Sequence, residues 1–310
     1  MIKEIAYGSR EEWLALRKNY IGGSDASAVV GMNPYKSAYA LWAEKTGKIP
    51  EFEGNLTTEV GSYLEDFVAH LFEKETGKKV RRKNRMLVND DYPFAHANVD
   101  RVVVGENAAL EIKTTNSIPA MKKLRGGEFP EQWYAQCMHY MAVGGFKKVY
   151  LAVLVNCREF MIFEIERDED EIAALMGAEK EFWSCVTENK PPMADGSSST
   201  TDALTTIYAE SNGETVSLFG YESKVREYLA LGKQIKSLKD SQDAIANEIK
   251  VYMGESERAD GDAFKVTWAS ASRSTFDAKA FAKDNPSVDL SRYYKTSSYR
   301  TFKVTERKDG

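Results

Sequence analysis

The sequence contains few cysteines and histidines, and their arrangement excludes several kinds of metal site. Its 310 residues include three cysteines and three histidines. No two cysteines form a CxxC pair, so we expect neither a structural zinc site nor an iron–sulfur cluster. The histidines, His70, His96 and His139, lack the spacing of metal ligands. Isolated cysteines also favour a reducing compartment.

Long apolar runs and nucleotide-binding loops are absent as well. No run of about 18 apolar residues and no charged-then-apolar leader occurs, so we expect no membrane span, no export and a cytoplasmic location. No GxxxxGK[ST] motif is present, and ATP use is therefore not expected. The hydrophobic content of 43% allows a sizeable core. The net charge of −5 does not indicate a nucleic-acid partner, but it excludes none, because electrostatic footprints are local.

One stretch, residues 97–113, combines a predicted β-hairpin with a cluster of charged residues. Two apolar or β-branched runs flank Gly105-Glu106, the pattern of a two-residue turn. In that register Asp100 faces Glu111 on the neighbouring strand, with Cβ atoms roughly 4.5–5.5 Å apart. Lys113 shares this face because side chains alternate along a strand. The hairpin therefore predicts two carboxylates and an ammonium on one face.

This charge cluster favours a cation site. Like charges directly opposite each other destabilise a sheet unless something neutralises them. Hard divalent cations such as Mg²⁺ bind oxygen ligands, which the side chains of Asp100 and Glu111 and the backbone carbonyl of Ile112 would supply. A second interpretation stays open, in which both acids are ordinary solvated strand charges. A three-residue loop would shift the register and separate them.

Several helices and strands are predicted around the hairpin. Ser9 begins a helix over Arg10–Tyr20, Ser24 or Asp25 caps a short helix ending at Val30, and Ser37 caps a helix over Ala38–Lys45. A long amphipathic helix spans Thr57–Thr76, with Glu65 at the margin of its apolar stripe. A basic stretch follows at Lys78–Arg85. Later come a helix over Pro130–Val143, a buried strand over Lys148–Val155, a strand over Glu159–Ile165 and a helix from Asp168 to Thr187.

Hydrolysis of a phosphodiester by two metal ions explains why these residue types would meet. Such a site needs carboxylates that hold cations roughly 3.5–4 Å apart, and a group that orients the attacking water and neutralises charge. Asp100 and Glu111 would bind the cations, and Lys113 would contact the water and the phosphate. Glu65 could complete the metal shell. Gln136 and Tyr140, one helical turn apart, could reach the same site.

The C-terminal third has a different character. Residues 191–212 are rich in turn-forming residues and are predicted to be a linker, followed by a module at 213–310. Two seams repeat at seven residues: Tyr221, Tyr228, Ile235, Gln242 and Ile249 in one, and Leu231, Leu238, Ile245 and Tyr252 in the other. Phe264–Trp268 is predicted to be a strand, Phe276–Lys283 a short helix and Tyr299–Val304 a second strand. The heptads could dimerise, fold back on the core or dock a partner.

The chain resembles the YqaJ-type viral recombinase family, the lambda-exonuclease-like branch of the PD-(D/E)XK nuclease superfamily. The resemblance covers Trp13 to Ile165, and its motifs occur in family order. They are Trp13–Arg17 with Ile21–Asp25, Gly61–Glu65, Asn98–Asp100, Glu111–Lys113 and Gln136–Tyr140. Two departures are Val99, where a proline usually precedes the acid, and Gly22-Gly23, where the lambda enzyme has bulkier residues.

The resemblance implies an α/β (α+β) fold with a restriction-endonuclease-like core, a mixed central sheet flanked by helices, within a nuclease domain at 1–190. It implies Mg²⁺ or Mn²⁺, two per site, with Asp100, Glu111, the Ile112 carbonyl and Glu65 as ligands. Lys113 would be catalytic and Gln136 would orient it or the water. Arg17 and Ser24 match a pocket for the 5′ phosphate, and Tyr140 is a further site residue.

The expected activity is ATP-independent resection of double-stranded DNA ends, 5′ to 3′, for phage-type recombination. A RecT-type single-strand annealing protein is the implied partner of a phage- or prophage-encoded homo-oligomer, and the lambda enzyme's ring suggests a trimer. Two other functions stay open: a PD-(D/E)XK endonuclease on the same core, and a catalytically inactive DNA-binding protein that assists recombination.

Overall fold

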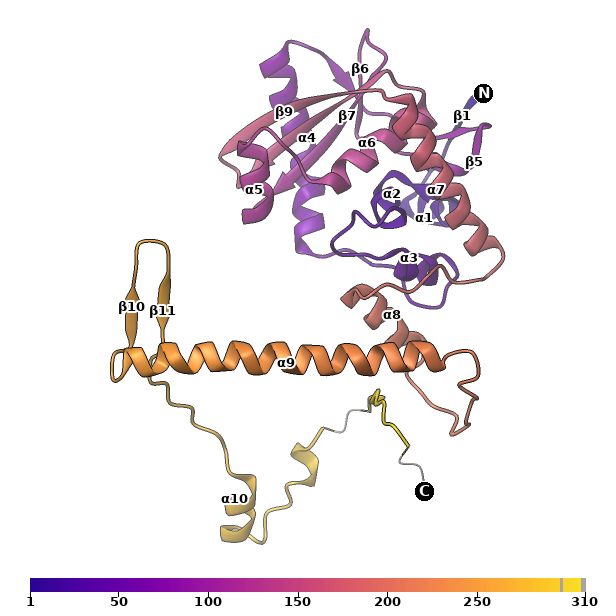
Figure 1. Ribbon diagram of the computed structural model, residues 1–310. Helices are drawn as coiled ribbons and strands as arrows, with labels where there is room; N and C mark the ends of the chain where they lie inside the picture. Colours follow the sequence, from indigo (N-terminus) through magenta and orange to yellow (C-terminus); the bar gives the residue numbers. More distant parts are fainter. Residues whose placement is uncertain (296–297, 308–310) are drawn as a thin grey trace. The chain divides into compact units, whose positions relative to one another are not determined.

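The computed structural model describes residues 1–295 and 298–307, which divide into two compact units, 1–208 and 209–310. Figure 1 shows the ribbon coloured along the chain. No helix in these ranges is long and apolar enough to cross a membrane.

The first unit contains a mixed five-stranded sheet, a four-stranded sheet and eight helices among the residues described. The five-stranded sheet has the order β3 (Val80–Arg81), β6 (Arg101–Val103), β7 (Ala108–Thr115), β8 (Lys148–Val155) and β9 (Glu159–Glu166). The four-stranded sheet has the order β1 (Ile2–Ile5), β4 (Met86–Asn89), β5 (Tyr92–Ala97) and β2 (Ile21–Gly22). Strands β7 and β8 are parallel, and their neighbours in the larger sheet are antiparallel. The expectation of a mixed α/β core is confirmed.

The sequence pattern predicted all but the fifth and the eighth of the eight helices described in this unit. They are α1 (Arg10–Arg17), α2 (Gly23–Val29), α3 (Ala38–Lys45), α4 (Leu56–Thr76), α5 (Ile118–Arg125), α6 (Glu131–Gly144), α7 (Glu169–Thr187) and α8 (Ser198–Ile207). Ser9 and Ser37 cap α1 and α3 as predicted, each accepting a backbone N–H. Helix α1 ends at Arg17, three residues earlier than expected. Neither residue expected to cap α2 occupies that position. The cap is Gly22, whose backbone N–H donates to the Asp25 carboxylate at 3.1 Å.

The central hairpin has the predicted register. Arg101 pairs with Leu110 and Val102 with Ala109, so the next residue along each strand sets Asp100 opposite Glu111. Gly105 has a φ of +84°, which a residue without a Cβ adopts at low cost. The alternative three-residue loop is therefore wrong, and the two carboxylates share a face.

The two faces of the larger sheet are covered by different helices. Helix α4 packs on one face, where Val68 and Phe72 meet Leu110 and Tyr150 in a buried cluster. Helix α6 lies over the other face, where it packs against β8 (Figure 1), and α7 packs against α6 and β5 within the main core. Glu111 and Lys113 alternate with Leu110 along β7 and so point to the α6 side. This arrangement sets the charged face of the hairpin against helix α6.

The predicted linker at 191–212 needs correction, because α8 lies inside it. Thr200 and Ala203 are buried, and the Thr200 hydroxyl donates to the Ser37 hydroxyl at 2.8 Å. The Ser37 N–H also donates to the Ser199 hydroxyl. Ser37 is the N-cap of α3, so α8 docks where α3 begins. Turn-forming composition suggested a loop, but serine and threonine are also favoured at helix N-termini.

The second unit contains α9 (Glu222–Met253), the hairpin of β10 (Arg258–Asp260) and β11 (Lys265–Thr267), and α10 (Ala278–Asp284). Helix α9 carries both predicted seams, and Met253 is its one buried residue. The strand expected over Tyr299–Val304 is wrong, because these residues are neither helix nor strand. The partner of β11 is instead β10, which is adjacent in the chain. Its sequence, Arg-Ala-Asp, has low strand propensity and gave no signal.

Candidate active site

Four polar side chains meet beside the hairpin and helix α6. The Lys113 ammonium lies 2.7 Å from Glu111 Oε1 and donates to Gln136 Oε1 at 2.8 Å. Asp100 Oδ2 accepts the backbone N–H of Ile112 at 2.7 Å, which holds that carboxylate across the two strands. Gln136 comes from α6, 23 residues after Lys113. The fold therefore brings together four of the residues that the sequence singled out.

Tyr140 extends this cluster toward helix α2. Its hydroxyl accepts a hydrogen bond of 2.8 Å from Gln136 Nε2, one turn earlier on α6. A Cβ on Gly23 would overlap the Tyr140 ring, so this close approach of α2 requires glycine. A Cβ on Gly22 would meet His96 Nε2 at 2.9 Å. The paired glycines that depart from the lambda enzyme thus have a steric reason.

The two carboxylates are placed where negative charge is costly. Burial raises the pKa of Asp100 well above its usual range, and the charges of Glu111 and Glu65 raise it further. Glu111 is only 2% exposed, and its Oε2 atom has no hydrogen-bond partner. Burial lowers the pKa of Lys113, but the negative charge of Glu111 outweighs that effect and leaves the pKa raised. Lys113 is therefore a protonated cation between two acids.

Glu65 approaches the site indirectly, through an arginine that sequence reasoning missed. Arg101, 4% exposed, forms ion pairs with Glu65 and with Asp66, the latter at 2.6 Å. It also donates to the backbone carbonyl of Asp100. An arginine inside the apolar run after Asp100 was the available signal, because a buried guanidinium needs a carboxylate partner. Arg101 ties helix α4 to the residue that carries the first site carboxylate.

The donor set fits a divalent cation. Asp100 and Glu111 offer oxygen ligands, and the unpartnered Oε2 of Glu111 is a buried acceptor without a donor. Within residues 1–295 and 298–307, no group of three or more His, Cys, Asp or Glu is arranged to hold a metal ion. Mg²⁺ commonly uses one or two protein carboxylates and takes its other ligands from water and substrate phosphate. The roles of Glu65 and of the Ile112 carbonyl as ligands stay predictions.

The residues expected to bind the 5′ phosphate lie near the start of α2. Ser24 is exposed and follows Gly23, which touches Tyr140. The Arg17 guanidinium lies 5.0 Å from the centre of the Trp13 ring and 4.0 Å from Asp25 Oδ1. Arg17 and Ser24 do not contact each other in any recorded bond, and their joint role stays a prediction.

Asp25 is the buried anchor of this region, and sequence reasoning gave it only a capping role. Its carboxylate lies 2.9 Å from the Lys45 ammonium, and both side chains are 6% exposed. Burial would raise the pKa of Asp25, but the positive charges of Lys45 and Arg17 outweigh burial and hold that pKa below its usual range. Lys45 also donates to the backbone carbonyls of Arg17 and Tyr20. Asp25 and Lys45 thus join α2, α3 and the end of α1.

An open hollow of about 620 Å³ lies between the N-terminal segment and Ser62 of α4. Tyr7, Arg10 and Trp13 line it from the N-terminal segment. Trp13 Nε1 donates to Asn98 Oδ1 at 3.2 Å, and Asn98 Nδ2 donates to the Tyr7 hydroxyl at 3.2 Å. Because Asn98 lies two residues before Asp100, these bonds connect the hollow to the site.

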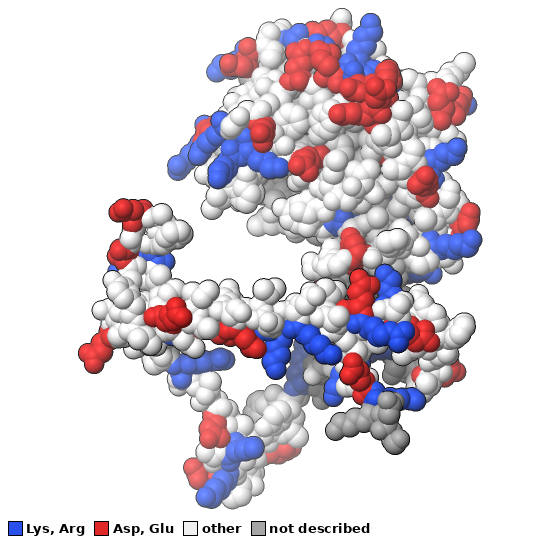
Figure 2. Space-filling model, in the orientation of Figure 1, with Lys and Arg blue, Asp and Glu red and all other residues white. Residues whose placement is uncertain are grey.

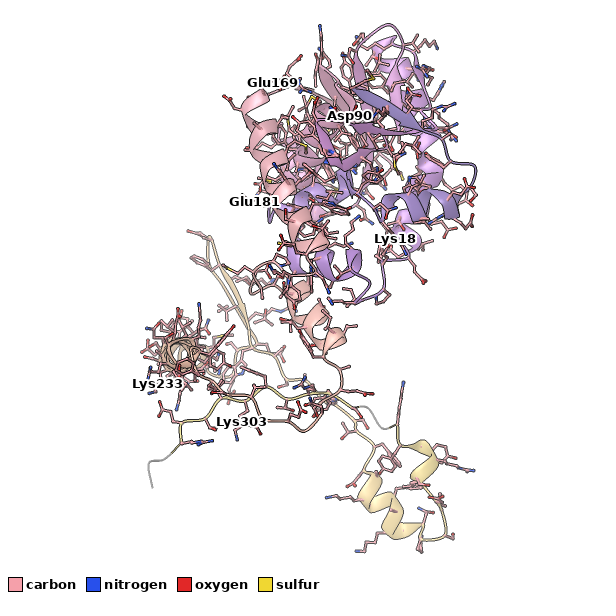
Figure 3. The ribbon with its side chains drawn as sticks, turned by 90° about the vertical axis from the view of Figure 1, so that its right-hand side faces the viewer. Lys18, Asp90, Glu169, Glu181, Lys233 and Lys303 are labelled. Carbon is pink, nitrogen blue, oxygen red and sulfur yellow. The ribbon has the colours of Figure 1, made fainter. Side chains whose placement is uncertain are left out.

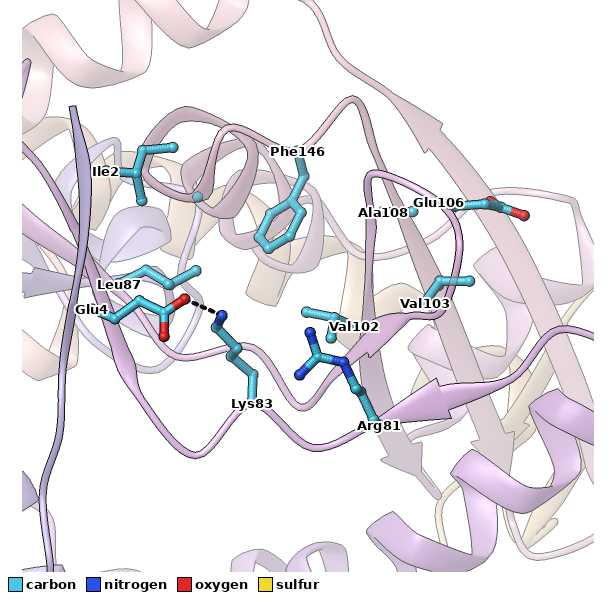
Figure 4. Close-up of a pocket in the computed structure, with 11 residues that line it drawn as sticks. Ile2, Glu4, Arg81, Lys83, Leu87, Val102, Val103, Glu106, Ala108 and Phe146 are labelled. Carbon is cyan, nitrogen blue, oxygen red and sulfur yellow. Dashed lines mark hydrogen bonds and ion pairs between the residues drawn. The ribbon is translucent and has the colours of Figure 1, made fainter.

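The first unit has two basic surfaces, and most of the cations in each form ion pairs with carboxylates. In the stretch 78–85, five of the six cations form ion pairs with carboxylates: Lys78, Lys79, Arg82, Lys83 and Arg85. A small pocket of about 240 Å³ lies there, and the Glu4–Lys83 ion pair is part of its lining (Figure 4). It adjoins Ala108, at the end of β7 opposite Lys113. It is therefore not part of the cluster.

The second basic surface lies on α5, which begins three residues after β7 ends. Lys122, Lys123 and Arg125 occupy its last turn, and Figure 2 shows blue side chains gathered there. Lys123 pairs with Glu131 at 3.7 Å and Arg125 pairs with Glu159, and Lys122 is exposed. Since β7 carries Lys113 near this end, α5 supplies positive charge on the side of the candidate site.

His139, on α6, has a structural role. Its Nδ1 lies 2.8 Å from Glu179 Oε1 on α7, and its Nε2 lies 2.8 Å from the backbone carbonyl of His96. Both His139 and Glu179 are completely buried. These bonds tie α6 to α7 and to the strand that precedes Asp100.

Comparison with known proteins agrees with this architecture. Residues 12–147 match the model of the YqaJ-like viral recombinase domain. The uncharacterized protein YqaJ of Bacillus subtilis (strain 168) is 37% identical over 304 residues, which cover 96% of this chain and 95% of that protein. The likeness therefore extends through the second unit.

Solved structures share the fold over part of this chain. An alkaline exonuclease (LHK-Exo) from Laribacter hongkongensis matches with a TM-score of 0.51 and 21% identity, over 58% of this chain and 93% of that one. LHK-Exo in complex with dAMP matches with a TM-score of 0.50 and 20% identity, over the same shares. The fold is thus exonuclease-like, and the full-length relative shows that this chain belongs to the YqaJ-like viral recombinase family.

Proposed function

We propose that this protein is a metal-dependent, ATP-independent exonuclease that resects double-stranded DNA ends for recombination. The observation that carries this proposal is the Lys113 ammonium, held between the Glu111 carboxylate and the Gln136 amide beside Asp100. A charged group fixed in this way needs no reorganisation when negative charge develops on a phosphate. The exonuclease-like fold supports the same conclusion.

In this mechanism Lys113 is the cation that faces the reacting phosphate. Gln136 fixes its position, because the Gln136 amide is itself held by the Tyr140 hydroxyl. Lys113 would orient the attacking water and neutralise charge as the phosphodiester breaks. Its raised pKa keeps it protonated at neutral pH, so in the resting site it acts as a proton donor and a positive charge.

Asp100 and Glu111 would hold one or two divalent cations, Mg²⁺ or Mn²⁺. A bound cation supplies a water of lowered pKa and positive charge at the scissile phosphate. The unpartnered Oε2 of Glu111 supports this assignment. Glu65 contributes through Arg101, which fixes the backbone of Asp100.

The direction of digestion would be 5′ to 3′, with Arg17 and Ser24 receiving the 5′ phosphate. Ser24 adjoins Gly23, and contacts lead from Gly23 through Tyr140 and Gln136 to Lys113. LHK-Exo has been solved with dAMP bound, which supports a nucleotide product or substrate on this fold. A homo-oligomer and a single-strand annealing protein of the RecT type are the proposed assembly and partner.

The test is digestion of linear duplex DNA, with and without a 5′ phosphate, beside closed circular DNA. Wild type and Lys113→Ala are compared with Mg²⁺ and with a chelator. We expect metal-dependent loss of the linear form alone, faster with the 5′ phosphate, and no digestion by the variant. Lys180→Ala, an exposed lysine on α7, is the matched control and should digest normally.

Other outcomes select the other functions. Cutting of the circle by wild type would identify an endonuclease on the same core. No cleavage with any divalent metal would identify a DNA-binding protein without catalysis. Equal rates with and without the 5′ phosphate would remove the proposed role of Arg17 and Ser24.

A further inference from the structure

The C-terminal segment 264–307 differs in charge from the rest of the chain. It contains nine of the 42 lysines and arginines but only four of the 47 aspartates and glutamates. The protein as a whole has a net charge of −5, so this segment is a basic region on an acidic protein. Such local charge, and not the net charge, determines attraction of a polyanion.

Aromatic side chains are interleaved with these cations and exposed to solvent. Seven of them are between 48% and 81% exposed: Phe264, Trp268, Phe276, Tyr293, Tyr294, Tyr299 and Phe302. Large rings normally bury most of their surface, so such a concentration of exposed rings marks a binding surface. Helix α10 is the only helix of two turns within this segment, among its described residues, and it covers none of these rings completely.

The pattern is densest between Arg292 and Lys303. This stretch of twelve residues has four cations and four aromatic residues and no acid. The Arg292 guanidinium lies 4.9 Å from the centre of the Tyr293 ring, which presents a cation and a ring together. Tyr299 is 80% exposed, and Lys303 projects from the chain in Figure 3. Cations and aromatic residues are therefore interleaved along this part of the sequence.

We propose that the cations and exposed rings of residues 264–295 and 298–307 form a binding site for single-stranded DNA, on a different unit from the candidate nuclease residues. Phosphates would be neutralised by the lysines and arginines, and unpaired bases would stack on the exposed rings. Duplex DNA offers phosphates but no free base faces, so the rings favour a single strand. An acidic protein would use the cations but has no need of alternating rings.

Only the biological role of this binding site, and not the binding itself, rests on the proposed function. An exonuclease that removes one strand leaves the other unpaired beside it, and this segment would hold that strand. Binding itself requires no cleavage. It can therefore be measured in chelator, where the result does not depend on whether the chain is a nuclease.

The experiment measures fluorescence anisotropy of a fluorescein-labelled oligo(dT) and of a blunt duplex of equal length, with the full chain in EDTA. The variant Tyr294→Ala/Tyr299→Ala removes two rings that are 68% and 80% exposed. We expect its affinity for oligo(dT) to fall about 10- to 100-fold, because each stacked base is stabilised by its ring. Its affinity for the duplex should change less than threefold.

Two further variants serve as comparisons. One measures the contribution of charge to DNA binding, and the other controls for the loss of any exposed ring in this unit. Lys295→Gln/Lys303→Gln should reduce the slope of log affinity against log salt by about 1.4, since each phosphate contact on a single strand contributes about 0.7. Tyr221→Ala removes a ring that is 66% exposed but lies before α9, and it should bind oligo(dT) like wild type.

Three outcomes would overturn the proposal. The first is unchanged oligo(dT) affinity in the double tyrosine variant, which would assign the segment to a protein partner. The second is an equal loss for oligo(dT) and duplex, which would indicate charge alone. The third is an equal loss in Tyr221→Ala. If oligo(dT) binding behaves as expected but linear duplex is never digested, this site stands and the proposed nuclease function fails.

Discussion

The two compact units use their apolar and charged residues in opposite ways. In the first unit, apolar side chains fill a continuous core, and charged groups such as Asp25 and Lys45 are buried in pairs. In the second unit, Leu238 on α9 is 71% exposed, and so are most of the aromatic rings that follow the helix. A long helix gains little stability without packing of its apolar face. The first unit therefore has a core that stabilises it, whereas the second unit leaves most of its large apolar side chains exposed.

The largest effect is expected from breaking a buried ion pair of the first unit. Asp25→Asn leaves the Lys45 ammonium buried without a counter-charge, which we expect to cost about 3–5 kcal/mol of unfolding free energy. Urea denaturation at pH 7, followed by tryptophan fluorescence, measures this difference. Because the pKa of Asp25 is lowered in the folded state, its stabilisation is present above the unfolded pKa of about 4 and is lost as pH falls. The gap between wild type and variant should narrow below that pH.

The second prediction concerns the catalytic effect of Lys113 and of Gln136, which holds it. Lys113→Ala should lower kcat for linear duplex about 100- to 1000-fold, the usual effect of removing a group that stabilises transition-state charge. Gln136→Ala should give a smaller loss, because Lys113 keeps its contact with Glu111. Single-turnover digestion measures both. If Gln136→Ala equals Lys113→Ala, then Gln136 contacts the reacting groups itself.

Truncation can test whether α8 belongs to the first unit. A chain ending at 208 keeps α8, whereas one ending at 195 loses the buried Ala203 and the half-buried Leu204 and Ile207. We expect the shorter chain to be less stable by about 2 kcal/mol, from the apolar surface that becomes exposed. Thermal and urea unfolding of both chains test this. Equal stability would mean that α8 belongs to the linker after all.

The pH dependence of metal binding offers a smaller effect. The raised pKa of Asp100 means that a proton competes with a cation for its carboxylate. The Mg²⁺ concentration for half-maximal digestion should therefore fall as pH rises, by up to about tenfold per pH unit in the range where Asp100 titrates. Digestion rates from pH 6 to 9 at several Mg²⁺ concentrations measure it. A half-maximal concentration independent of pH would contradict the assignment of Asp100 as a ligand.

The smallest effect is expected at the surface of the same unit. Asp90 pairs with Lys3 at 2.6 Å, but both side chains are about half exposed. Exposed ion pairs contribute little, because water and salt screen them. Asp90→Asn should leave the urea midpoint unchanged within error. A loss comparable to that of Asp25→Asn would show that burial is not what separates the two pairs.

Local patterns were sufficient for much of the fold and part of the site. Ser37 and Gly77 mark helix ends because capping depends on a few neighbouring residues. The face shared by Asp100, Glu111 and Lys113 followed from one turn and the alternation of strand side chains. These relations join residues that are close in the sequence, so the sequence pattern predicts them directly.

Only the tertiary structure decided which distant groups meet. Gln136 reaches Lys113 because α6 crosses the sheet, and Glu65 is held by Arg101, which no periodicity could pair with it. The pattern at 191–212 indicated a linker. Instead, α8 forms there and packs against the start of α3, where Thr200 donates to Ser37. Sequence spacing determines faces and caps, whereas packing between elements determines partners, since those contacts depend on the path of the whole chain.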